Sequence, residues 1–428
     1  SANSNCMVGK FELVDKLVGT IVDNTTKLVH RGKAIAIQIQ SLIARNKLAE
    51  AIVVARGILQ SLNVELPSEP TEEITQSAMA NIEQQLAEIE NIDGLGRMVD
   101  PLKLAAMNIL SNMASAAYIG FPQLYPLIVL QQIELSLKFG YSDETAYAFS
   151  TYGLILCAFA GDIKAGNDAA DVALKLMEQS QSIEYNAKIS TLIYSFVRVW
   201  RDPLQMGLKP LLKAYHDGLL SGDLEFACYC IHNHCLIAYI AGQNLLDLQQ
   251  KMHDYGNAIA NFKQSTALNF LQITHQAVLN WIGESDNPAI MTGSVYDETK
   301  RIAEHQAAGD SYSIGSTYAL KLIMAYHFTT PEAAWEIAQI ASQTTSDIAG
   351  ISILGAFHLY HALTLLANSQ PIAEDLEKLK KWSKYSPTTF QHKCDLLEAE
   401  KHRVFGERKD AIELYDKSIA GAKENEYI

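Results

Sequence analysis

The stretch that decides the fold lies at 396–422 and reads LLEAEKHRVFGERKDAIELYDKSIAGA. Small residues stand in it at Ala399 and Ala411, a glycine stands between them at Gly406, and an aromatic follows at Tyr415. Small side chains let two helices approach closely, and glycine commonly ends a helix because it adopts the left-handed conformation. The stretch therefore predicts two helices that pack against each other, with a turn at Gly406.

A weaker copy of this pattern, LIARNKLAEAIVVARGIL, lies at 42–59 and has Ala51 in the place of Ala411. The order of small residue, glycine, alanine and aromatic is typical of a degenerate tetratricopeptide repeat, a unit of two antiparallel helices. The same kind of helix pair is therefore expected near both ends of the chain.

Helix breaks recur about every 20 residues along the chain, which predicts helices of about four turns joined by short loops. The breaks are Gly140, Gly161, Asp202-Pro203, Gly222, Gly242, 283–288, 309–310, 329–331, 369–371, 386–387 and Gly406. Five prolines follow a residue suited to helix capping, and proline is favoured at the first position of a helix. These pairs are Asp100-Pro101, Asp202-Pro203, Asn287-Pro288, Thr330-Pro331 and Ser386-Pro387.

These patterns predict an all-α fold, an α-solenoid of antiparallel helix pairs similar to tetratricopeptide arrays, with about 40 residues in each unit. The sequence LNVELPSEPTEE at 62–73 is the one clear loop. We therefore expect an N-terminal helical unit at 1–61, a loop at 62–73 and a continuous solenoid at 74–428. Helices of a solenoid are covered by neighbouring repeats, which fits a composition that is 48% hydrophobic.

The bulk composition excludes several classes of protein. The 428 residues carry a net charge of −14, whereas a nucleic-acid-binding protein usually has a basic surplus. The six cysteines are unevenly spaced and do not form a secreted disulfide framework. The most apolar window, 352–367, is too short to span a bilayer, and the first residues given do not show the basic, apolar and small-residue order of a signal peptide. We expect a cytoplasmic protein without nucleic-acid or membrane partners. We also expect a fragment of a longer protein, because the sequence opens with SAN and not with methionine, and because its last residues, AGAKENEYI, contain no signal that stops a helix.

The sequence CYCIHNHC at 228–235 is the stretch richest in possible metal ligands. On a helix with about 100° per residue, Cys228, His232 and Cys235 share one stripe, and Cys230 and His234 lie on nearly the opposite face. At most three of the five side chains can therefore bind one ion. The apolar neighbours favour a packed helix in which cysteine acts as a small hydrophobic residue. A metal or redox site at Cys228, His232 and Cys235 stays as the alternative.

Other candidate residues admit the same two interpretations. Cys157 is interpreted as a packed cysteine, and His358 and His361 as buried histidines, since no carboxylate partner accompanies them in the sequence. Tyrosines on apolar helices can line a groove for a peptide or small ligand, or fill gaps between helices. They are Tyr118, Tyr125, Tyr147, Tyr152, Tyr229 and Tyr239. No P-loop, HExxH, GxSxG or kinase signature occurs, so no catalytic residue and no cofactor is expected.

Long strings of the chain resemble one family of large bacterial multidomain signalling proteins. They lie at 100–140, 150–166, 208–230, 264–288 and 396–428. The first of them reads DPLKLAAMNILSNMASAAYIGFPQLYPLIVLQQIELSLKFG. Members of this family join a serine/threonine-kinase-like domain, a predicted ATPase module, a helical-repeat region, a GAF domain and often a sensor histidine kinase. The resemblance covers the helical-repeat region only, from about residue 30 onward.

The resemblance implies a non-catalytic scaffold or sensory region that mediates protein–protein interaction or coupling between domains. The kinase and ATPase motifs of the family lie outside this region, so no catalytic residue is carried over. The implied partners are proteins or peptides, including flanking domains of the same chain. The alternative is a sensor for a small ligand or metal, with a pocket in the solenoid groove. The segment matching 226–235 has no fixed cysteine–histidine set in relatives, which implies local variation there.

Overall fold

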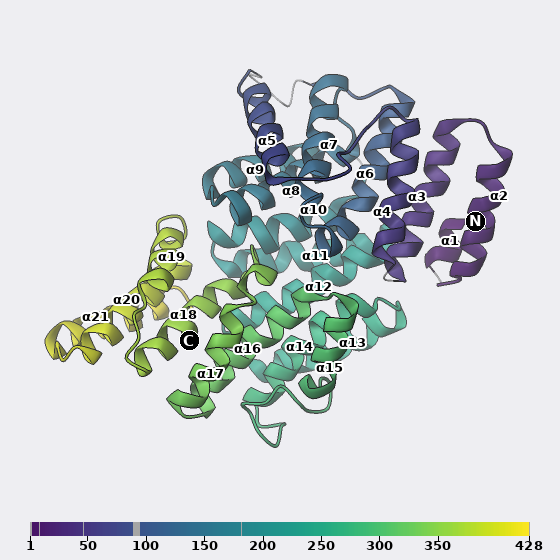
Figure 1. The fold of residues 1–428 in the computed structure, drawn as a ribbon. Helices are drawn as coiled ribbons and strands as arrows, with labels where there is room; N and C mark the ends of the chain where they lie inside the picture. The colour runs from purple at the N-terminus through teal and green to yellow at the C-terminus, as the bar shows by residue number, and fades with distance from the viewer. Residues whose placement is uncertain (1, 8, 46, 89–94, 181, 428) are drawn as a thin grey trace. The chain divides into compact units, whose positions relative to one another are not determined.

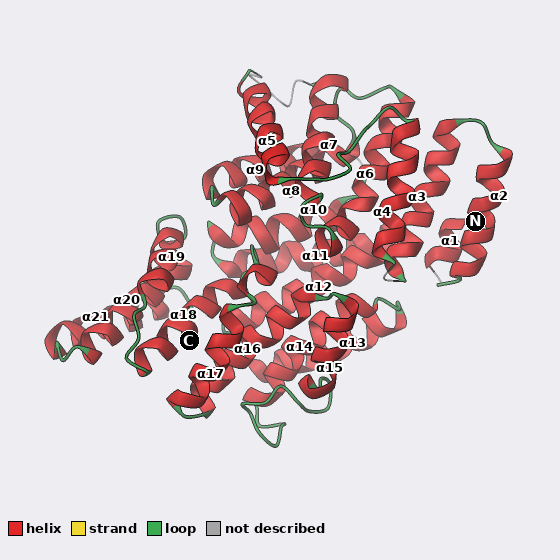
Figure 2. Ribbon diagram, viewed as in Figure 1, coloured by secondary structure: helices red, strands yellow, loops and turns green. Residues whose placement is uncertain are grey.

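A computed structural model describes residues 2–7, 9–45, 47–88, 95–180 and 182–427. Within these ranges the regular secondary structure is helical (Figure 2). Two isolated β-bridges join Arg97 to Tyr141 and Thr292 to Asp297, but no strand forms in the described residues. The chain is therefore all-α, as the sequence predicts. None of the described helices combines the length and apolar character needed to cross a bilayer.

The α-helices follow one another along the chain with short connections (Figure 1). Their bounds are α1 (Ala2–Met7), α2 (Phe11–Asn24), α3 (Leu28–Ala44), α4 (Leu48–Ser61), α5 (Glu72–Ala87), α6 (Pro101–Gly120), α7 (Tyr125–Phe139), α8 (Asp143–Ile155), α9 (Ile163–Gln179), α10 (Asn186–Leu192), α11 (Leu208–Ser221), α12 (Leu224–Ile240), α13 (Leu245–Asn261), α14 (Ser265–Trp281), α15 (Glu298–Ala308), α16 (Ser311–Phe328), α17 (Pro331–Ser342), α18 (Ile353–Ala367), α19 (Ala373–Ser383), α20 (Pro387–Val404) and α21 (Arg408–Glu424).

Short irregular helices interrupt this series. Among the described residues, two are π-helices, η2 (Leu156–Ala160) and η3 (Ile193–Val197), and three are 3₁₀-helices, η4 (Arg198–Trp200), η5 (Leu204–Gly207) and η6 (Thr345–Ile348). Helix α4 ends at Ser61 and α5 begins at Glu72, so most of the segment 62–73 is the connection between them.

The chain divides into two compact units. Unit 1 comprises Ser1–Leu156, Lys164–Ile189 and Asp217–Leu224, and unit 2 comprises Cys157–Ile163, Ser190–His216 and Glu225–Ile428. The chain passes between the units more than once, and the sequence did not predict this division.

Three of the five predicted proline starts begin an α-helix: Pro101 starts α6, Pro331 starts α17 and Pro387 starts α20. The Asp100 carboxylate accepts a hydrogen bond from the Leu102 amide at 2.8 Å and so caps α6. The other two expectations were wrong. Pro203 precedes the 3₁₀-helix η5, and Pro288 lies in the long connection between α14 and α15.

The core of unit 1 centres on α6, α7 and α8, which pack against one another. Helix α8 is buried from Glu144 to Ile155, which leaves only its first residue outside the core. A helix that is buried on all sides needs neighbours on all sides, so α8 lies at the centre of its unit.

Unit 2 alternates two kinds of helix. We call α12, α14, α16, α18 and α20 the inner helices, because each of them buries eight or more residues. Helices α13, α15, α17, α19 and α21 bury only a few positions each. Within unit 2, α14 packs on α16, α16 on α18 and α18 on α20, and each of α13, α17, α19 and α21 packs on an inner helix (Figure 1).

Close packing between inner helices depends on a glycine. A Cβ atom added at Gly355 of α18 would lie 2.7 Å from Cε1 of Phe390 on α20, which is closer than van der Waals contact allows. Gly256 on α13 differs, since the nearest atom to an added Cβ is Cδ2 of Leu271 at 3.9 Å. The absence of a side chain at Gly355 therefore lets α18 and α20 approach.

We predict that Gly355→Ala lowers the free energy of unfolding by about 1–3 kcal/mol, because overpacking displaces Phe390. The matched substitution Gly256→Ala should raise it by about 0.5–1 kcal/mol, because alanine restricts the unfolded chain and fits the helix. Urea unfolding followed by circular dichroism measures both. Equal effects of the two substitutions would contradict the packing described here.

Candidate functional site

The CYCIHNHC stretch lies in the middle of α12, inside unit 2. Cys228, His232 and Cys235 are 0, 2 and 0% exposed. Nε2 of His232 lies 2.9 Å from the hydroxyl of Tyr312 on α16, so the imidazole is held by a neighbouring inner helix. The three side chains therefore belong to the packed interior of the unit.

The opposite face of α12 is bonded to a different part of unit 2. Sγ of Cys230 lies 3.1 Å from Oγ1 of Thr191. Nδ1 of His234 lies 3.0 Å from the carbonyl oxygen of Leu208. His232 on one face and Cys230 and His234 on the other therefore have different partners, as the helical geometry predicts.

Burial sets the protonation states of the predicted metal candidates. It lowers the pKa of His232 to about 3 and raises the pKa of Cys235 to about 12. At neutral pH the imidazole is then uncharged and the thiol keeps its proton, whereas a metal ligand must be a thiolate. Cys157, which is buried 4.0 Å from the carbonyl oxygen of Ile163, has a pKa raised to about 12 by burial, with a smaller contribution from Asp162.

One group of three metal-ligating side chains has its ligand atoms within 4.8 Å of one another in the described residues: His402, Glu407 and Asp410. They lie at the turn between α20 and α21, where Nδ1 of His402 is hydrogen-bonded to a carboxylate oxygen of Glu407. Glu407 is the residue before α21, and Asp410 lies in its first turn, where carboxylates favour helix formation without a metal. Cys228, His232 and Cys235 do not form such a group.

The histidine pair of α18 has a carboxylate partner that the sequence analysis missed. Oδ1 of Asp375 lies 2.6 Å from Nδ1 of His358, and Oδ2 lies 2.7 Å from Nδ1 of His361. Burial alone would raise the pKa of Asp375, but hydrogen bonds from the two imidazoles outweigh it and lower that pKa. Asp375 is 4% exposed, so this bridge fastens α19 to α18 inside the unit.

A buried lysine is a second feature that the sequence analysis missed. Nζ of Lys393, on α20, donates a hydrogen bond to the carbonyl oxygen of Thr389 at 2.5 Å and lies 4.2 Å from the ring centroid of Tyr427. Burial lowers the pKa of Lys393 to about 7. None of the described carboxylates forms an ion pair with it. A fully buried lysine without an acidic partner is unusual, and sequence spacing gives no sign of it.

Three of the predicted groove-lining tyrosines lie in the core of unit 1, which corrects that prediction. Tyr125, Tyr147 and Tyr152 are 3, 2 and 3% exposed. The ring of Tyr118 lies 5.2 Å from the ring of Tyr125, centroid to centroid, in an edge-to-face arrangement. These rings fill space between helices, so they do not line an open groove.

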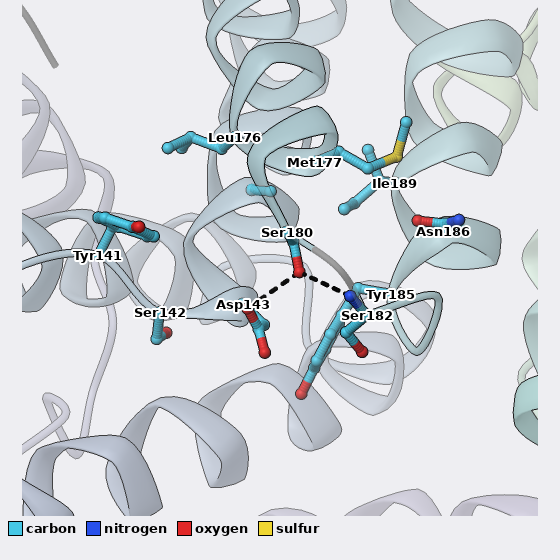
Figure 3. Close-up of a pocket in the computed structure, with 11 residues that line it drawn as sticks. Tyr141, Ser142, Asp143, Leu176, Met177, Ser180, Ser182, Tyr185, Asn186 and Ile189 are labelled. Carbon is cyan, nitrogen blue, oxygen red and sulfur yellow. Dashed lines mark hydrogen bonds between the residues drawn. The ribbon is translucent and has the colours of Figure 1, made fainter. Parts of the chain in front are cut away.

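Unit 1 has a small pocket beside this core (Figure 3). Ser180 donates a hydrogen bond to the Asp143 carboxylate at 3.2 Å and accepts one from the Ser182 amide at 3.2 Å. Nearby, the Tyr185 hydroxyl donates to the Glu144 carboxylate at 2.9 Å. The cavity of about 10 Å³ has room for about one water molecule. This pocket is therefore too small for a substrate or a peptide side chain.

Tyr229 and Tyr239, both on α12, are only partly buried and lie in two groups of rings in unit 2. In the first group, the Phe270 ring lies 6.1 Å from Tyr229 and 4.1 Å from Tyr312. His232 also lies beside it, with its ring centroid 5.5 Å from that of Phe270. Tyr229 stacks on Phe270, and Phe270 and Tyr312 lie beside His232, the middle residue of the cysteine–histidine stripe.

The second group forms a continuous row across four inner helices. We call Tyr239, Trp281, His327, Phe328 and Tyr360 the aromatic row. Nε1 of Trp281 donates a hydrogen bond to the Tyr239 hydroxyl at 2.8 Å. The Trp281 ring lies 5.0 Å from His327 and 5.1 Å from Phe328, and Nε2 of His327 lies 3.2 Å from the Tyr360 hydroxyl. Phe328 is 42% exposed, so the row reaches solvent.

Comparison with known proteins gives one partial match. No family model matches the chain, and no solved structure matches it. A stretch of 169 residues is 22% identical to hybrid signal transduction histidine kinase G of Dictyostelium discoideum. This stretch is 39% of the chain and spans 5% of that protein. The chain is thus distantly similar, over part of its length, to a small part of a signal-transduction histidine kinase.

We predict that His232→Gln makes the protein less sensitive to acid. The imidazole has a pKa of about 3 when folded and about 6.5 when unfolded, so the unfolded chain alone takes up a proton as the pH falls below 6.5. From pH 7 to pH 5 this uptake costs the wild type ~2 kcal/mol of stability. Urea unfolding at both pH values should show that the variant loses less by about this amount.

Tyr312→Phe is the matched control, since it removes the partner hydroxyl and keeps the titrating imidazole. It should lower stability by about 1 kcal/mol at both pH values and leave the acid-dependent loss in place. An unchanged pH dependence in His232→Gln would show that the pKa of His232 does not differ between the folded and unfolded chain, which contradicts the effect of burial.

We predict that Lys393→Met stabilises the protein by ~1–3 kcal/mol at pH 7, because a buried charge is replaced by an apolar chain of similar length. In the wild type, the unfolded lysine keeps its proton up to about pH 10 while the folded one releases it near pH 7. Wild-type stability should therefore rise by ~2 kcal/mol from pH 7 to pH 9, and this rise should vanish in the variant. Lys409→Met, at an exposed position of α21, is the control and should change stability by less than about 0.5 kcal/mol.

Proposed function

We propose that this chain is a non-catalytic scaffold or sensory region of a multidomain signalling protein, and that it binds a protein or peptide segment on the aromatic row of unit 2. The observation that carries the proposal is a line of partly exposed rings on four consecutive inner helices. Aromatic side chains supply large contact area at low entropic cost and are enriched at protein interfaces.

The proposed architecture is an α-solenoid of tetratricopeptide-like helix pairs. Inner helices of unit 2 begin at Leu224, Ser265, Ser311, Ile353 and Pro387, which are intervals of about 40 residues. Packing of one inner helix on the next supports this arrangement, because repeats of a solenoid contact mainly their neighbours. Such an array presents side chains from successive repeats along one extended surface.

The proposed context is signalling. The partial similarity to a histidine kinase supports it, and so does the resemblance of the chain to the helical-repeat region of bacterial kinase–ATPase proteins. In such a protein, a segment bound to the helical region shifts the equilibrium between arrangements of the flanking domains. The serine/threonine kinase, ATPase and histidine kinase activities belong in this proposal to those flanking domains.

The protonation and oxidation states of the cysteines support the proposal of a non-catalytic, cytoplasmic region. Burial raises the pKa values of Cys157, Cys235 and Cys394 to about 12, 12 and 11, so these thiols are poor nucleophiles at neutral pH. Cys6, Cys157, Cys235 and Cys394 form no disulfide bond in the part of the chain that the structure describes, which fits a reducing compartment.

A peptide-display selection on the immobilised chain tests the proposal. We expect enriched peptides that bind the chain in solution with one-to-one stoichiometry, measured by isothermal titration calorimetry. Phe328→Ala should weaken this binding by about tenfold or more, because an exposed ring of the row is removed. Phe159→Ala removes an exposed ring of unit 2 outside the row and should leave affinity unchanged. Failure to obtain any peptide that binds in solution, or equal affinity in Phe328→Ala, would reject the proposal.

A further inference from the structure

The helices that carry the aromatic row lie in parts of the sequence without lysine or arginine. Three long stretches, 214–250, 264–299 and 322–377, contain neither residue, and their charged side chains other than histidine are all acidic. These stretches include α12, α14 and α18, and the last turns of α16. These stretches therefore contribute only acidic charges, apart from histidine, to the part of unit 2 that holds the row.

Exposed carboxylates follow the rings of the row along the chain. Asp247 lies in the first turn of α13, just after α12 ends, and Glu332 lies in the first turn of α17, just after α16 ends. Glu284 and Asp286 follow Trp281, the last residue of α14. All four carboxylates are exposed. Hydrogen bonds from its own backbone amide and from Thr330 lower the pKa of Glu332, so this carboxylate stays charged at neutral pH.

Neighbouring rings of the aromatic row meet in edge-to-face arrangements. Trp281 makes interplanar angles of 65° with His327 and 61° with Phe328. The face of an aromatic ring carries negative charge density and attracts a cation within about 6 Å of its centre. Burial lowers the pKa of His327, so this imidazole is neutral at pH 7 and does not repel a cation. A row of this kind is complementary to positive charge.

From these rings and carboxylates we infer that the aromatic row binds an extended, basic protein segment whose arginine side chains stack on Trp281 and Phe328 and face Glu284 and Glu332. The inference rests on the proposed function, since it names the chemistry of the partner for the same surface. Arginine is favoured over lysine because its planar guanidinium stacks on aromatic rings while its N–H groups reach carboxylates. The acidic surroundings disfavour nucleic acid, which carries the opposite charge to the one required.

The experiment uses a fluorescein-labelled peptide of alternating arginine and serine as the probe. Fluorescence anisotropy measures its binding to the whole chain, and versions with lysine, glutamine or glutamate in place of arginine are compared with it. We expect the arginine peptide to bind most tightly, the lysine peptide less tightly, and the glutamine and glutamate peptides at least about tenfold more weakly. Raising the ionic strength should weaken binding of the arginine peptide, because exposed carboxylates contribute to it.

Variants of the chain separate stacking on the row from general attraction to an acidic protein. Trp281→Ala should weaken binding of the arginine peptide about tenfold, and Trp281→Phe should restore much of the affinity because a ring face is regained. Glu332→Gln should weaken binding and reduce its dependence on salt. Phe159→Ala is the control and should bind as the wild type does. Circular dichroism is used to check that each variant keeps its helices.

Three outcomes would overturn the inference: equal affinity of Trp281→Ala and the wild type, equal affinity of the glutamine and arginine peptides, or no binding of the arginine peptide. The peptide-display selection distinguishes these from failure of the proposed function. Selected peptides that are neutral or acidic and that lose affinity in Phe328→Ala would reject a basic partner and support the aromatic row as a binding surface.

Discussion

Burial of the inner helices on nearly all sides is the constraint on which the structure of unit 2 depends. Helix α12 is buried from Phe226 to Ala238, apart from the partly exposed Tyr229. A helix of this kind is stable only when neighbours cover it, because one contact stripe would leave most of its apolar surface in water. Polar side chains inside such a helix must then bond locally, as Gln276 does when it donates to Asn280 at 2.8 Å on α14.

The same burial keeps most reactive side chains away from solvent and favours their uncharged forms. His232, Cys235 and Lys393 are each shifted toward the uncharged form, because the apolar surroundings disfavour charge. Asp375 keeps its charge only because two imidazoles donate hydrogen bonds to it. Titratable groups inside the unit therefore act on stability and its pH dependence, and recognition depends on side chains that reach the surface.

The helical content and several helix starts could be predicted from the sequence, because helix capping and the effect of proline depend on adjacent residues only. Asp100, Thr330 and Ser386 all stand immediately before an α-helix. Contacts between distant residues could not be predicted in this way. Asp375 meets His358 and His361 only because α19 folds back on α18, and no spacing rule identifies it among 48 acidic residues. The two-unit division was missed for a similar reason, since it depends on packing between helices of like composition.

The sequence also could not predict whether a tyrosine lies in the core or at the surface. Tyr147 and Tyr239 both lie on strongly apolar helices, yet Tyr147 is central in α8 and Tyr239 is the second-last residue of α12. In α12, α14 and α16 the last one to three residues are less buried than the turns before them. Trp281 and Phe328, which end α14 and α16, share this position. Rings at these ends can therefore contact a partner while the buried middle turns keep the fold, and residues of the adjoining loops set the charge that the partner meets.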